Sequence, residues 1–193
     1  MKKVLLVSLL FVMVLGSSSV FAAEKVPLGA GNLALKVDYI NFTDADTENF
    51  DVGSGLYVGL EAYSHLVDSA PNFYIGMEVG YTNIDGDMDN SDSNHETEAS
   101  FVPIELNLKY AMNVVPNLEL DLGAGASINY AKIQVPGTGD DWLWGAQIFA
   151  DLNYKINQFF LGINAKYQMM ENFDDTDISF RNWRFGGQAG IMF

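Results

Sequence analysis

The sequence has 193 residues, enough for one domain, and its net charge is −15, with 10 basic and 25 acidic residues. This acidic balance argues against nucleic-acid binding, which needs basic patches, and the absence of cysteine excludes disulfide bonds. Hydrophobic residues make up 49% of the chain, yet no stretch after residue 22 is apolar for long enough to predict a transmembrane helix.

The first 22 residues have the pattern of a secretory signal peptide. Lys2 and Lys3 give a charged start, residues 4–15 are apolar, and Ala22 ends a small-residue cleavage site. The apolar core is shorter than the about 20 residues that a membrane-anchoring helix needs. We expect cleavage after Ala22, or after Ala23, and a single domain over residues 23–193. That domain has 8 basic and 25 acidic residues, a net charge of −17.

Eight segments of the remaining chain alternate apolar and polar residues. In the first segment, Leu35, Val37 and Tyr39 alternate with Lys36 and Asp38. This period of two predicts β-strands with one apolar and one polar face. Each segment is about as long as a tilted transmembrane strand, roughly 9–11 residues. The expected strands cover residues 33–39, 56–62, 73–81, 102–110, 118–130, 142–154, 159–167 and 183–193.

The connections between these strands alternate in length. Short connections are expected at 64–72, 112–117 and 156–158, and long ones at 43–54, 85–100, 133–141 and 170–181. Outer-membrane barrels have short turns on the periplasmic side and long loops outside. The pattern therefore predicts an all-β, eight-stranded antiparallel up-and-down transmembrane barrel, with both termini in the periplasm.

Alternation alone does not say which face points outward, and a soluble barrel with an apolar interior is the competing fold. Two features favour an apolar face in lipid. Glycines are frequent on the polar face, where they make room inside a narrow eight-stranded barrel. Aromatic residues lie near both ends of the apolar faces, as in two girdles flanking a band about 25 Å tall. The glycines are Gly59, Gly76, Gly80, Gly123, Gly125, Gly145, Gly162, Gly186 and Gly190, and the aromatic pairs are Phe73/Tyr81, Trp144/Tyr154, Phe159/Tyr167 and Trp183/Phe193.

The polar faces carry charges of both signs, which must pair or meet water inside a membrane protein. We expect a side-chain ion-pair network that fills the barrel and leaves no sizeable pore, with a narrow ion path as the alternative. The predicted central members are Lys36, Glu61, Glu78, Glu105, Lys109, Lys166 and Arg184.

The signal peptide, the eight alternating strands and the closing segment 183–193 resemble the small outer-membrane β-barrel superfamily of the OmpA transmembrane domain and OmpX. In that superfamily a terminal aromatic residue, preceded by apolar residues at alternate positions, is recognised by the barrel assembly machinery. Phe193, Ile191, Ala189 and Phe185 fit this pattern, whereas Gly187 departs from it. The resemblance implies a Gram-negative outer-membrane location and makes Phe193 the expected assembly signal.

Some small barrels are enzymes that resemble hydrolases with a His–Ser pair on their strands. The chain has two histidines, His65 in an expected short connection and His95 in a long loop. Neither is followed two residues later by a serine along a strand, although Ser64 precedes His65. A nucleophile needs a base within hydrogen-bond reach, so we do not expect an enzyme. A small lipid-modifying barrel enzyme and a narrow porin-like channel remain the alternatives to a structural or interaction barrel.

The connection 85–100 contains the acidic run Asp85 to Glu96, with acidic residues at positions 1, 3, 5 and 12 of a twelve-residue calcium loop. Asn90 replaces the usual glycine at position 6, and Asp92 replaces the usual hydrophobic residue at position 8. The alternative is a solvated acidic loop without metal, which is what charge runs on loops usually are. The hypothesis is weak Ca²⁺ binding by Asp85, Asp87, Asp89 and Glu96.

The long connections hold 16 of the 25 acidic residues and almost no Lys or Arg. They could meet lipopolysaccharide phosphates only through divalent cations, because direct contact would place like charges together. The expected partners are outer-membrane lipids, lipopolysaccharide and the barrel assembly machinery, and the expected state is a monomer with no cofactor beyond possible Ca²⁺.

Overall fold

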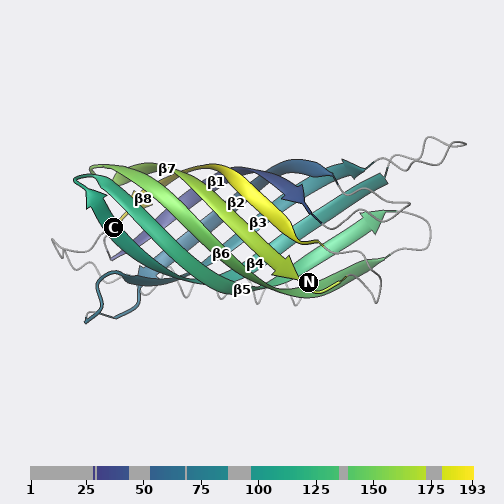
Figure 1. Ribbon diagram of the computed structural model, residues 1–193, viewed down its shortest axis with the longest axis horizontal. Helices are drawn as coiled ribbons and strands as arrows, with labels where there is room; N and C mark the ends of the chain where they lie inside the picture. Colours follow the sequence, from purple (N-terminus) through teal and green to yellow (C-terminus); the bar gives the residue numbers. More distant parts are fainter. Residues whose placement is uncertain are drawn as a thin grey trace, which may run out of the picture.

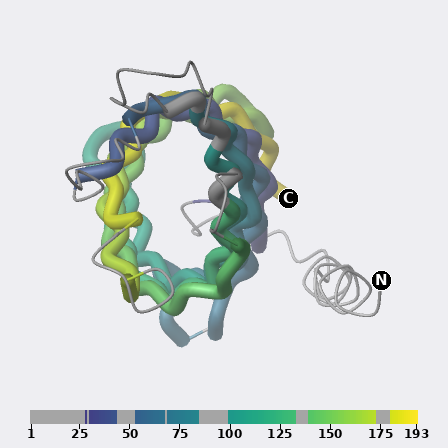
Figure 2. Tube along the Cα trace, turned by 90° about the vertical axis from the view of Figure 1, so that its right-hand side faces the viewer, coloured from purple at the N-terminus to yellow at the C-terminus, as the bar shows by residue number. Residues whose placement is uncertain are grey.

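The computed structural model describes residues 28, 30–43, 53–67, 69–86, 97–134, 139–172 and 180–193. Within these ranges the chain forms a closed antiparallel barrel in which sequence neighbours pair and β1 also pairs with β8. Figure 2 shows the closed ring of strands. The predicted eight-stranded up-and-down barrel is confirmed. The strands are β1 (Gly31–Phe42), β2 (Ser54–His65), β3 (Phe73–Gly86), β4 (Thr97–Val115), β5 (Leu118–Gln134), β6 (Asp140–Ile156), β7 (Phe159–Met170) and β8 (Asn182–Met192).

The strands cross the long axis of the barrel obliquely, as Figure 1 shows. Following paired residues once around the barrel leads from Asn32 on β1 to Phe42 on the same strand, a displacement of ten residues. With about 3.3 Å per residue and about 4.8 Å between strands, this displacement corresponds to a tilt of roughly 40°. A tilted strand of about ten residues then spans a hydrocarbon layer about 25 Å thick.

Most strands extend beyond the ranges expected from alternation. β4 has 19 residues and begins at Thr97, and the predicted connection 112–117 is paired strand as far as Val115. β6 likewise begins at Asp140, inside the predicted loop 133–141. The reason is that backbone pairing continues where the apolar alternation ends, since a hairpin ladder does not need lipid on its outer face.

Two of the short connections are two-residue turns, Pro116-Asn117 and Asn157-Gln158. Asn117 and Asn157 have φ angles of 66° and 56°, the left-handed region that asparagine tolerates better than most residues. We call the end of the barrel with these turns the turn end and the opposite end the loop end.

The exterior is apolar, as predicted for a face in lipid. Alternate residues of every strand expose large hydrophobic side chains, whereas the charged positions between them are buried. Aromatic pairs form contacts at both ends of the exterior: Phe73 and Tyr110 at the turn end have ring centroids 5.0 Å apart, and Tyr167 and Trp183 at the loop end 4.5 Å apart. Within the described ranges, no helix is long and apolar enough to cross a membrane.

Inward-facing glycines make room for large side chains. The Tyr57 ring lies across Gly80, where an added Cβ would stand 2.1 Å from it, and the Phe149 ring lies in the same way across Gly123. An outward-facing exception is Gly187, whose Cβ would meet nothing closer than 3.6 Å. The glycine pattern therefore shapes the lumen, because a neighbouring side chain fills the space: a ring at Gly80 and Gly123, and a polar side chain at Gly125 and Gly162.

The ladder between β3 and β4 is interrupted at one point. Pairing stops after Val79↔Ile104 and resumes at Thr82↔Phe101 in the same register. Pro103 lies in this gap, and proline has no backbone N–H to donate. Proline is usually confined to edge strands, and a closed barrel has none. Pro103 therefore interrupts a ladder between two strands.

Candidate functional site in the barrel interior

The central ion network is defined by Lys36, Glu61, Glu78, Glu105, Lys166 and Arg184, all buried. Its geometry follows from register. Glu61 is opposite Glu78, and Glu78 is opposite Glu105, so three neighbouring strands present a row of carboxylates. Like charges directly opposite each other destabilise a sheet. The compensating cations come from β1, β7 and β8, and only closure of the barrel brings the two sets together.

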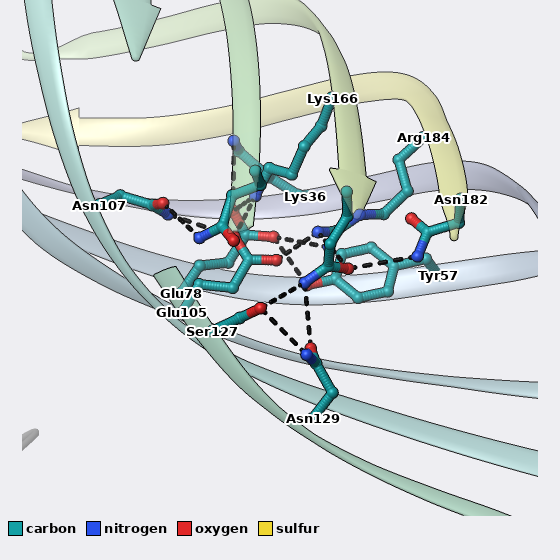
Figure 3. A network of polar contacts seen from close by, with 12 residues as sticks. Lys36, Tyr57, Glu78, Glu105, Asn107, Ser127, Asn129, Lys166, Asn182 and Arg184 are labelled. Atoms are coloured by element: carbon teal, nitrogen blue, oxygen red, sulfur yellow. Dashed lines mark hydrogen bonds and ion pairs between the residues drawn. The ribbon is translucent and has the colours of Figure 1, made fainter. Parts of the chain in front are cut away.

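Glu78 is the centre of this network. Its carboxylate lies 2.6 Å from Lys166 Nζ, 3.2 Å from Arg184 Nη1 and 3.5 Å from Lys36 Nζ. The Tyr57 hydroxyl donates a hydrogen bond of 2.7 Å to the same carboxylate. Figure 3 shows these side chains converging from different strands.

Glu105 completes the central contacts. It pairs with Lys166 at 2.5 Å and with Arg184, and it accepts a hydrogen bond from Asn107 at 3.2 Å. Lys36 links this group to Glu61 at 2.8 Å and to Asp151 at 3.6 Å. Such pairs need several partners each, because the cost of removing charge from water otherwise exceeds the attraction.

Lys109, the seventh residue expected in the network, lies apart from it. Its ammonium pairs with Asp121 at 3.1 Å and lies 3.9 Å from the centre of the Tyr63 ring. Nearer the turn end, Lys155 pairs with Glu119 at 3.4 Å. The structure thus brings six of the seven residues together and places Lys109 in a second group closer to the turns.

The loop end of the interior is apolar, which the sequence analysis did not anticipate. We call this set the mouth cluster. Phe42 packs edge-on against Phe101 and Phe180, with ring centroids 5.7 Å apart in each pair, and Phe101 and Phe180 stack at 6.0 Å. The sequence does contain a signal for this apolar end, because Ile40 and Phe42 follow Asp38 on the inward face of the same strand. The mouth cluster consists of Ile40, Phe42, Tyr57, Ile84, Ala99, Phe101, Ala131, Leu143, Met170 and Phe180.

Ser64 and His65 are adjacent residues of β2, and successive side chains of a strand point to opposite faces. They therefore do not form a nucleophile–base pair. The His65 ring instead packs edge-on against Tyr74, with centroids 5.7 Å apart. His95 lies outside the described residues.

The proposed calcium loop is mostly outside the described residues. Asp85 belongs to β3, where its backbone is opposite Glu98 of β4, and Thr97 is opposite Gly86. Asp87, Asp89 and Glu96 lie in the connection between these strands and are not described. Calcium binding there stays a prediction, as does the signal peptide at residues 1–22, which also lies outside the described residues.

Phe193 lies where the barrel closes. Its N–H donates to the Gly31 carbonyl and its carbonyl accepts from the Gly31 N–H, both at 3.0 Å. Its side chain is exposed on the outside of the barrel at the turn end, beside the aromatic girdle. Gly187, the position of the closing segment that departs from the family pattern, faces outward, where an added Cβ would meet nothing closer than 3.6 Å.

A closed eight-stranded barrel with an apolar exterior, aromatic residues at both ends and charged side chains inside defines a small integral barrel of the outer membrane. The chain belongs to the family described as "Outer membrane protein beta-barrel domain", whose model matches residues 7–186. The search of curated proteins found no match to this chain.

Solved structures with the same fold include other outer-membrane barrels. Neisserial surface protein A is 15% identical, with a TM-score of 0.62 over 86% of this chain and 98% of that one. OprG from Pseudomonas aeruginosa is 12% identical, with a TM-score of 0.55 over 88% and 100%. The N-terminal barrel domain of OprF from Pseudomonas aeruginosa is 14% identical, with a TM-score of 0.51 over 86% and 98%. At these identities the likeness concerns the fold.

Proposed function

We propose that the protein is a non-enzymatic scaffold barrel of the outer membrane that presents its acidic loops at the cell surface and forms no large pore. The observation that carries this proposal is the filled interior. Side chains of the central ion network meet across the lumen, and the mouth cluster packs above them at the loop end. An eight-stranded barrel has an interior just wide enough for such filling.

The orientation in this proposal places the turns and both termini in the periplasm and the connections 44–52, 87–96, 135–138 and 173–179 outside. Short turns on the periplasmic side are the rule for this class of barrel. The acidic residues of the long connections would then face lipopolysaccharide phosphates, with divalent cations between the two negative surfaces. The proposed partners are lipopolysaccharide and the assembly machinery, and the proposed state is a monomer.

Conductance of the pure folded protein in planar lipid bilayers tests the closed interior. We expect no stable large current steps from the natural chain. Phe101→Ala combined with Phe180→Ala is expected to give the same result, because the central ion network still fills the lumen below the mouth cluster. The control is Phe185→Ala, which truncates an outward-facing ring. Stable large steps from the natural chain would refute the proposal, and steps appearing only in the double variant would make the mouth cluster the gate of a channel.

A further inference from the structure

One layer of the interior contains four side-chain oxygen atoms without a partner among the described residues. They are Oε1 of Glu61, Oδ2 of Asp151, Oδ1 of Asn164 and Oε1 of Gln188, and none of them makes a hydrogen bond or an ion pair. All four side chains are more than nine-tenths buried. Buried acceptors of this kind normally have a partner, which can be a water molecule or an ion.

The four oxygen atoms belong to one level of the barrel. Asn164 is directly opposite Asp151 across β7 and β6, and Gln188 is directly opposite Lys36 across β8 and β1. The Lys36 ammonium lies 2.8 Å from Glu61 and 3.6 Å from Asp151. Glu61 of β2 and Asp151 of β6 therefore contact the ammonium of Lys36. Asn164 of β7 and Gln188 of β8 stand on the strands next to them, directly opposite Asp151 and Lys36.

The two amide groups have a fixed orientation. Asn164 Nδ2 donates to Asp38 at 2.9 Å, and Gln188 Nε2 donates to Asn153 Oδ1 at 2.6 Å. Asn153 in turn donates its Nδ2 to Asp121 at 3.1 Å. Because the nitrogen ends are engaged, the oxygen ends of Asn164 and Gln188 are the ones left to accept.

The charges of this layer do not balance. Lys166 and Arg184 meet Glu78 and Glu105, while Lys109 pairs with Asp121 and Lys155 with Glu119. Lys36 is then the cation in direct contact with Glu61 and Asp151. Together with Lys109 it faces three carboxylates, those of Glu61, Asp151 and Asp121, so one negative charge in the layer has no counterpart among the described residues. The described interior as a whole holds the buried carboxylates Asp38, Glu61, Glu78, Glu105, Glu119, Asp121 and Asp151 against the cations Lys36, Lys109, Lys155, Lys166 and Arg184.

We propose that this layer binds one monovalent cation such as Na⁺, with Glu61, Asp151, Asn164 and Gln188 as oxygen ligands. A single positive charge cancels the residual negative charge of this layer, whereas the other unbalanced carboxylate of the interior, Asp38, accepts a hydrogen bond from Asn164. Carboxylate and amide oxygens are ligands that hard cations prefer. A divalent ion is disfavoured, because no group of three or more His, Cys, Asp or Glu side chains in the described ranges is arranged to hold a metal. A proton on Glu61 or Asp151 would cancel the same charge, and the exchange of salts described below separates the two, because a protonated carboxyl gives no dependence on Na⁺.

The test is the thermal unfolding of the folded barrel in detergent micelles, followed by tryptophan fluorescence and by heat-dependent mobility on gels. NaCl is exchanged stepwise for N-methyl-D-glucamine chloride at constant ionic strength, because this organic cation is too large for a filled interior. A ligand bound only by the folded state raises the unfolding temperature with its concentration. We expect the unfolding temperature to rise with the Na⁺ concentration.

Three variants localise the effect. Asp151→Asn removes the uncompensated charge and is expected to abolish the Na⁺ dependence. Gln188→Leu removes one ligand oxygen without changing charge and is expected to shift the dependence to higher Na⁺ concentration. Glu119→Gln, a buried carboxylate of the Lys155 pair, is the control and is expected to keep the dependence. Equal unfolding temperatures of the natural chain in the two salts would overturn the proposal, as would an unchanged Na⁺ dependence in both Asp151→Asn and Gln188→Leu.

Discussion

The effect of a single residue in this barrel depends on whether its side chain faces the lumen or the lipid. Gly80 and Gly187 are both mid-strand glycines, yet Gly80 faces the crowded lumen and Gly187 faces the lipid. The Tyr57 ring occupies the space over Gly80 and stacks under the Arg184 guanidinium, whose central carbon is 4.5 Å from the ring centre. A residue with no side chain thus determines where a tyrosine and an arginine of the central ion network lie.

Gly80→Ala is expected to destabilise the barrel, because the new methyl group would stand 2.1 Å from the Tyr57 ring and force it to move. Overpacking of this kind costs about 1–3 kcal/mol. Gly187→Ala is the matched control and is expected to be neutral or slightly stabilising, since its methyl group meets open space and restricts the unfolded chain. Urea unfolding in lipid vesicles measures both, and equal stability of the two variants would contradict the expectation.

Among the strands, β3 and β4 form the pair with the gap in its ladder. Pairing is missing between Val79↔Ile104 and Thr82↔Phe101, and Pro103 lies in the gap. β4 and β5, by contrast, pair along almost their whole length, with one irregularity between Asn113 and Val115. The wall of the barrel is therefore unevenly supported by hydrogen bonds, although every strand has two neighbours.

The gap predicts locally faster hydrogen exchange. Backbone amides of residues 80 and 81 are expected to exchange faster than those of residues 75–79 on the same strand, because opening there breaks fewer hydrogen bonds. Pro103→Ala restores an N–H on β4 and is expected to slow this exchange. NMR of the folded protein in micelles measures the rates. Uniform protection along β3 in the natural chain would show that the gap has no effect on local stability.

At the level of the whole molecule, the barrel has two unlike ends. The turn end has the two-residue turns and the paired C-terminus, and the loop end has the mouth cluster and the long acidic connections. The interior has an apolar cluster toward each end, with the central ion network between them. Leu28, Tyr63, Tyr74, Ala111 and Phe149 pack together nearer the turns, and the mouth cluster packs at the loop end. This filling suits a barrel that is closed inside while its loops are presented on one side.

The proposed orientation predicts which end is accessible on intact cells. An epitope inserted in the connection 87–96 is expected to bind antibody without permeabilisation, because that connection would be outside. The same epitope in the connection between β2 and β3, at residues 66–72, is expected to bind only after the outer membrane is permeabilised. Antibody binding with the reverse pattern would place the termini outside.

The alternation of side chains determined the barrel by itself. A strand has a strict period of two, so eight apolar stripes separated by turn residues fix the number of strands, their antiparallel order and the faces they present. The glycines on the polar faces and the aromatic residues at strand ends predicted that the polar faces point into the barrel and the apolar faces into lipid. These properties depend on neighbouring residues of one strand, so they can be predicted from the sequence alone.

The pairings inside the barrel were decided only by tertiary structure. Lys36 and Asp151 lie on strands that are distant in sequence, and the ten-residue displacement around the barrel sets which charges share a level. Mid-strand position suggested that Lys109 belongs with the central residues, but its ion pair is with Asp121, its diagonal neighbour on β5. Phe180, two residues before β8, joins the mouth cluster through contacts with Phe42 of β1 and Phe101 of β4. Contacts across the lumen depend on closure, and closure is a property of all eight strands together.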